Sequence, residues 1–137
     1  MIRLDRELAA LYTRALVAIA RADGEISFDE GMQLHHVIAR RCEQAPSLED
    51  LLLEPPLAPH ELLGVVAERG PFRGAAIHPA QLAELLVGDA IAILLAKGHA
   101  TSEETALLRA FAAALGATEA DFARMTAHVS RWLVPLA

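Results

Sequence analysis

The chain has 137 residues, one cysteine and a formal net charge of −6, and 54% of its residues are hydrophobic although only 4% are aromatic. A core built mainly of Leu, Ile, Val and Ala favours a helical bundle over a sheet, and the length fits a single domain. The negative charge argues against nucleic-acid binding, which depends on clustered Lys and Arg, and the lone Cys42 cannot form an internal disulfide.

Neither a membrane span nor a signal peptide is predicted. The most apolar stretch, residues 85–96, contains Gly88 and Asp89 and is shorter than the roughly 18–20 residues that cross a bilayer. The first residues carry charges within their apolar pattern and show no cleavage-site run. We therefore expect a cytoplasmic protein.

The first predicted helix spans about residues 3–22, where apolar residues recur at spacings of three and four. Asp23 and Gly24 end it, because glycine adopts the left-handed conformation at a helix end without steric cost. Ser27 and Glu30 then form a capping box that starts a second helix. That helix ends near Arg41 and Cys42, and the arginines 40 and 41 suit the negative end of the helix dipole. Its apolar side is expected to carry Phe28, Met32, a partly buried His35, Val37 and Ile38.

Residues 43–79 form a proline-rich connecting segment that holds six of the seven prolines in the chain. Proline and glycine divide it into short helices, predicted at 47–53 and 59–69. Because leucine and valine persist throughout, we expect the segment to pack on the bundle and not to act as a polar linker.

The second half of the chain repeats the pattern of the first. A helix opened by Pro79 runs to about residue 96, a capping box of Thr101 and Glu104 starts the next, and a last helix covers 118–134. No strand is predicted. Residues 1–137 are therefore interpreted as one domain of six to seven helices, in which repeat 1 is 3–42, the connecting segment 43–79, repeat 2 about 80–115 and the C-terminal helix 118–134.

The two repeats align without a gap when residues 22–30 are placed over 96–104. Each repeat is a helical hairpin with one apolar face, so two copies can bury these faces about a pseudo-two-fold axis. The matching pairs at the turn are Ala22 and Ala96, Gly24 and Gly98, Ser27 and Thr101, and Glu30 and Glu104.

The motif Ala22-Asp23-Gly24-x-Ile26-x-x-x-Glu30, echoed at residues 96–104 and flanked by apolar helices, resembles the TerB-like family. This family comprises the tellurite-resistance B proteins and a related helical domain of some membrane-anchored co-chaperones. The resemblance covers residues 4–41 and 82–115 and implies a non-enzymatic, cytoplasmic all-α domain of stress-response or envelope-associated systems.

For metal binding, the resemblance implies that acidic residues of the paired turns are ligands, which carries over to Asp23, Glu30 and Glu104. This sequence departs from the pattern at a fourth position, where it has Lys97 in place of an acid. If the turns meet at the pseudo-two-fold axis, the ammonium of Lys97 would lie beside Asp23 or Glu30.

The first turn gathers the carboxylates of Asp23, Glu25, Asp29 and Glu30, which are oxygen donors of the kind that hard cations prefer. The spacing matches only the second half of an EF-hand loop, which excludes a tight calcium site of that type. The metal candidates are Asp23, Glu25, Glu30 and Glu104. Capping and turn formation explain most of these acids without a ligand, so we favour the structural interpretation and expect any divalent metal to bind weakly.

Few other residues are candidates for chemistry. Asp89 interrupts an apolar stretch and is expected to be partly buried and paired with an arginine or a backbone N–H; the alternative is a site carboxylate. Cys42 is expected to be an inert thiol at a helix end, and not a nucleophile with His36 as its base. His60 should lie in the exposed first turn of a helix. His99 should lie in the turn between the two helices of repeat 2.

We favour a non-enzymatic TerB-like interaction domain with a protein partner, and the broad apolar helix faces suggest a homodimer. Two alternatives stay open: a metal-sensing or metal-storage domain, and a small enzyme that uses Asp89 or a histidine in a pocket of the helical bundle.

Overall fold

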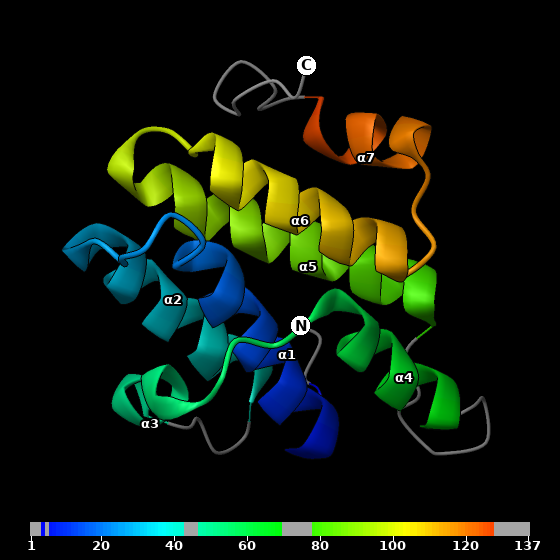
Figure 1. Cartoon of the computed structure of the whole chain (residues 1–137), viewed down its shortest axis with the longest axis horizontal. Coiled ribbons are helices and arrows are strands. Elements are labelled where there is room, and N and C mark those ends of the chain that lie inside the picture. Colours follow the sequence, from blue (N-terminus) through cyan, green and yellow to red (C-terminus); the bar gives the residue numbers. More distant parts are fainter. Residues whose placement is uncertain (1–3, 5, 43–46, 70–77, 128–137) are drawn as a thin grey trace.

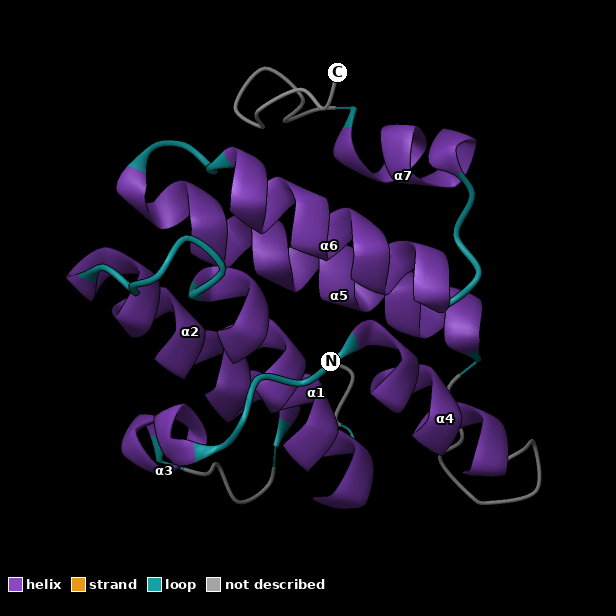
Figure 2. Cartoon of the chain, viewed as in Figure 1, coloured by secondary structure: helices purple, strands orange, loops and turns teal. Residues whose placement is uncertain are grey.

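The computed structural model describes residues 4, 6–42, 47–69 and 78–127, and over these residues the chain is an all-α bundle without strands. The prediction of the fold class is confirmed (Figures 1 and 2). None of the helices in the described ranges combines the length and apolar character of a membrane-spanning segment. The elements are α1 (Arg6–Ala20), α2 (Phe28–Arg41), α3 (Leu48–Leu53), α4 (Pro59–Arg69), α5 (Pro79–Leu94), the 3-10 turn η1 (Leu95–Lys97), α6 (Ser102–Ala114) and α7 (Glu119–Thr126).

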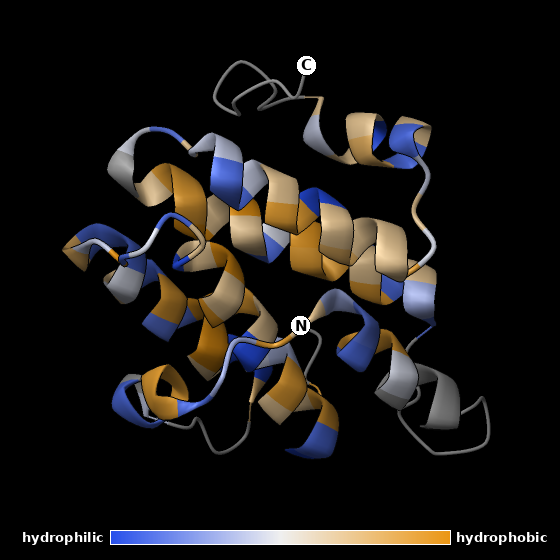
Figure 3. Ribbon diagram, in the orientation of Figure 1, coloured by the Kyte–Doolittle hydropathy of each residue, from blue (hydrophilic) through white to orange (hydrophobic). Residues whose placement is uncertain are grey.

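The core lies where α1 and α5 meet the other helices. α5 packs on α1, α2, α6 and α7, and α1 also contacts α4 and α6. Figure 3 shows strong hydrophobic colour along α1 and α5. Their fully buried side chains include Leu16, Ile19, Leu86 and Ile93, and each buried side chain of this size contributes about 1.5–3 kcal/mol to stability.

The described parts of the proline-rich connecting segment pack on the bundle, as predicted: α3 contacts α1, and α4 contacts α1 and α6. α3 starts at the N-cap Ser47, whose Oγ accepts from Asp50 N at 3.1 Å, and α4 begins at Pro59. Leu57 and Leu62 are buried. Residues 43–46 and 70–77 lie outside the described part of the chain.

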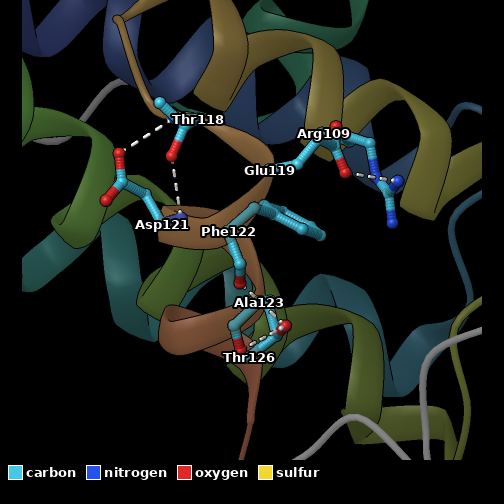
Figure 4. Close-up of polar contacts among 7 residues, drawn as sticks. All are labelled: Arg109, Thr118, Glu119, Asp121, Phe122, Ala123 and Thr126. Carbon is cyan, nitrogen blue, oxygen red and sulfur yellow. Dashed lines mark hydrogen bonds and ion pairs between the residues drawn. The ribbon is translucent and has the colours of Figure 1, made fainter.

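α7 is fixed to the end of α6 by polar and aromatic contacts (Figure 4). Arg109 Nη1 donates to Glu119 Oε2 at 2.9 Å, and its guanidinium lies 5.1 Å from the centre of the buried Phe122 ring. Thr118 and Asp121 form a capping box, in which the hydrogen bonds from Thr118 lower the pKa of Asp121. The predicted continuation of this helix to residue 134 lies outside the described residues.

Two predicted helix ends are corrected by a few residues. The first helix ends at Ala20 and not at residue 22, because the chain tightens into a turn in which Ala22 N donates to Ile19 O at 3.2 Å. The helix from Pro79 ends at Leu94 and continues as η1 up to Lys97. Hydrogen bonds from the N–H of residue i+3 to the C=O of residue i, as in a 3-10 helix, are common at helix ends because they satisfy the last carbonyls.

Candidate functional site

The two turns that align in the sequence also share their backbone geometry. Gly24 and Gly98 have φ of 109° and 106°, a conformation that side chains other than glycine rarely adopt. Gly24 N donates to Arg21 O at 3.0 Å, and Gly98 N donates to Leu95 O at 2.9 Å. The local motif thus recurs as predicted, while the pseudo-two-fold relation of whole repeats stays a prediction.

Both predicted capping boxes are present, and each buries its glutamate. Ser27 N donates to Glu30 Oε1 at 3.0 Å, and Thr101 N donates to Glu104 Oε1 at 2.8 Å. In return, the hydroxyl oxygens of the two caps accept from the backbone N–H of the glutamates. The glutamate side chains contact the ends of their own helices, so Glu30 and Glu104 have a structural role with or without a metal.

The other acidic candidates lie at the surface of the first turn. Asp23 Oδ1 accepts from Glu25 N at 3.3 Å, which closes a local turn, and both residues are exposed. Among the residues that the structure describes, no group of three or more His, Cys, Asp or Glu side chains is placed to hold a metal ion. The side chain of Lys97 lies outside the described part, so its place beside the acids stays a prediction.

Tyr12, Arg41 and Asp89 form a polar network inside the bundle. Tyr12 Oη donates to Asp89 Oδ2 at 2.6 Å. Arg41 donates two hydrogen bonds to the same carboxylate, from Nε to Oδ2 at 2.8 Å and from Nη2 to Oδ1 at 2.9 Å. The expected pairing of Asp89 with an arginine is confirmed, and the network ties α1, α2 and α5 together.

Burial makes this network electrostatically strong. The side chain of Asp89 is 7% exposed and that of Arg41 13%, so water screens the ion pair poorly. Burial, followed by the negative charge of Asp89, raises the pKa of the Tyr12 hydroxyl well above its usual value. The hydrogen bonds to Asp89 raise the pKa of Arg41. Tyr12 therefore remains a neutral donor and Arg41 a cation over the physiological range.

The apolar side predicted for α2 is partly wrong. Phe28 is 81% exposed and Met32 48% exposed, and His35 is exposed and not partly buried. Val37 and Ile38 are buried as predicted, and the buried side of the helix also carries Glu30 and Leu34. The hydrogen bonds of the capping box satisfy Oε1 of Glu30, which allows this side of the helix to face the core.

The remaining candidates lie as expected. Cys42 is a buried thiol at the C-cap of α2, His60 is exposed in the first turn of α4, and His99 is exposed in the second turn. His35 and His36 are adjacent and both exposed, with ring centres 6.3 Å apart.

A row of exposed side chains along α2 is the feature that sequence reasoning missed. Phe28, Met32, His35 and Ala39 follow one another at intervals of four, three and four residues, which places them on one side of the helix. We call this row the outward face of α2. Two of the four large hydrophobic residues that are exposed in the described chain belong to it, and the other two, Leu52 and Leu53, lie on α3.

The sequence held partial signals for the outward face of α2 and for Tyr12 as a second partner of Asp89. A tyrosine within an apolar stripe needs a hydrogen-bond partner for its hydroxyl, which indicated that Tyr12 donates to a buried polar group. The spacing of Phe28 and Met32 indicated a helix face but gave no sign of whether this face packs on the core.

The chain matches no protein-family model, no curated protein and no solved structure.

Proposed function

We propose that this chain is a non-enzymatic interaction domain of TerB-like type, which acts in a stress response by binding another protein through the outward face of α2. The observation that carries the proposal is the exposure of Phe28 and Met32, one turn apart at the start of the helix. Leaving a phenylalanine ring and a methionine in water forgoes the free energy of burying them, about 1.5–3 kcal/mol for each when burial is complete. A protein partner would recover part of it.

The fold itself does not need these two side chains. α6 starts with the same capping box as α2, and its residues equivalent to Phe28 and Met32 are Ser102 and Ala106, both exposed. A small or polar residue is therefore sufficient at these positions for a helix of this kind. This contrast favours a role in binding for the larger residues of α2.

The outward face is carried by a firmly held element. On the opposite side of α2, Leu34 and Val37 are fully buried, and Arg41 at the end of the helix is bound to Asp89. A face on a helix that is already packed binds without the entropic cost of ordering the backbone, because the backbone is ordered before the partner arrives.

The ionisable groups in the described interior support a non-enzymatic role. Asp89 is the carboxylate that the sequence offered as a catalytic alternative. Its Oδ2 accepts hydrogen bonds from Tyr12 and Arg41, and its Oδ1 accepts one from Arg41. A carboxylate that is bound in this way stabilises the bundle and is poorly placed to take a proton from a substrate.

Photo-crosslinking in the native host tests the proposal. A benzophenone amino acid is placed at position 28 or 32, with positions 102 and 106 of α6 as matched controls. We expect a discrete adduct from the α2 positions and none from the control positions. Equal labelling from both helices, or no adduct from α2, would overturn the proposal.

A further inference from the structure

The outward face of α2 has the spacing of a coiled-coil seam. Its residues Phe28, Met32, His35 and Ala39 are separated by four, three and four residues, which is the alternation of a and d positions in a heptad. The buried residues of the helix lie on the other side, so the seam is left for a second helix. A large residue stands at one end of the seam and a small one, Ala39, at the other.

Charges of opposite sign flank the two ends of this seam. Asp29 is exposed in the first turn of α2 and Arg40 is exposed in its last turn. The two residues are eleven positions apart, which is close to three full turns of about 3.6 residues, so they lie on the same flank of the seam. A partner helix that complements α2 must therefore be basic where α2 is acidic and acidic where it is basic.

We infer that the partner of this face is a second copy of the same chain, with the two α2 helices antiparallel about a two-fold axis. This inference rests on the proposed function and names the partner. The axis crosses the seam between Met32 and His35, so that Phe28 of each copy meets Ala39 of the other. A two-fold axis of this kind keeps each flank on its own side, which brings Asp29 of one copy beside Arg40 of the second. In a parallel pair the axis would run along the helices and put this flank of the two copies on opposite sides, so Asp29 of one copy would not meet Arg40 of the other.

The size of the seam sets the strength of the association. α2 has 14 residues, so the contact is about 21 Å long and one helix diameter, about 10 Å, wide. This strip covers less than the roughly 800 Å² per partner that standard stable interfaces bury. We therefore expect a weak, reversible dimer with a dissociation constant in the micromolar to millimolar range.

Sedimentation equilibrium of charge-reversal variants tests the inference. Asp29→Arg and Arg40→Asp each place like charges together at both ends of the dimer, so each should weaken it about tenfold. An equal mixture of the two variants should restore the wild-type affinity, because each charge then meets its opposite in the heterodimer. Glu103→Arg is the matched control, since Glu103 occupies the same position in the first turn of α6, and it should dimerise like the wild type.

Rescue in the mixture also separates lost pairing from lost folding, since a misfolded variant would not be rescued; circular dichroism of each variant checks this directly. A wild-type chain that is monomeric at millimolar concentration, or a mixture no better than its components, would overturn the inference. If the wild-type chain is monomeric, an adduct from position 28 with a different protein would still support the proposed function. The absence of any adduct would overturn both the proposed function and the dimer.

Discussion

Replacement of Asp89 by asparagine removes the charge at the centre of the buried network while keeping the size of the side chain. The carboxylate accepts three hydrogen bonds, one from Tyr12 and two from Arg41. An asparagine presents an NH₂ group where one oxygen stood, and it leaves the guanidinium without its counter-ion. Loss of one partner of a buried ion pair costs about 3–5 kcal/mol, and because Arg41 retains 13% exposure we expect the lower end, about 3 kcal/mol.

This loss is large beside the total stability of a domain, about 5–15 kcal/mol. For a chain of this length it corresponds to a fall in Tm of about 10 °C. Urea unfolding followed by circular dichroism measures it. The control is Glu84→Gln, which breaks the exposed ion pair in which Arg124 Nη1 lies 3.0 Å from Glu84 Oε1, and which should cost less than about 1 kcal/mol.

A double-mutant cycle with Tyr12→Phe adds a second check. Since both side chains belong to one network, the cost of the double variant should fall short of the sum of the single costs by about 1 kcal/mol. If Asp89→Asn is no more destabilising than Glu84→Gln, the network does not hold the three helices together and the reasoning is refuted.

Three further predictions concern titration, backbone and metal. Tyr12 is the only tyrosine of the chain, so tyrosinate absorbance reports this residue alone. Its pKa in the folded protein lies above the unfolded value of 10.0. Its contribution to the free energy of unfolding is therefore complete below pH 10 and is lost as the pH rises further. We expect ionisation near pH 10 in urea and only at higher pH in the native protein, and coincident curves would contradict this. Gly98→Ala should cost about 1–2 kcal/mol in urea unfolding because of its positive φ, whereas Gly88→Ala, in open space within α5, should stabilise by about 0.5–1 kcal/mol; equal effects would disprove the role of φ. Calorimetry with calcium, magnesium, manganese and zinc should show weak binding, and sub-micromolar binding abolished by Asp23→Ala would establish a metal site.

The helices could be predicted because their boundaries are set by local signals. The capping boxes at Ser27 and Thr101, the proline that opens α5 and the glycine at each turn act through residues that lie within four positions of one another. These interactions form in the same way wherever the helix later packs.

The orientation of α2 and the partners of Asp89 could not be predicted in this way. α2 has one candidate stripe through Phe28 and Met32 and another through Leu34 and Val37, and periodicity alone does not decide which of the two turns inward. Burial of Glu30 on the second stripe becomes acceptable only through its capping hydrogen bonds. The partners of Asp89 lie 48 and 77 residues away, so they are brought together by the packing of whole helices.

The methyl resonances of the methionines test the interaction surface most directly. Met32 lies on the outward face of α2, while Met125 on α7 is partly buried against the core and serves as an internal reference. As the protein is diluted from millimolar to micromolar concentration, the proposal predicts that the Met32 resonance shifts towards a solvent-exposed value and that Met125 stays in place. An unchanged Met32 resonance over the whole range, or a shift of Met125 in its place, would contradict self-association through α2.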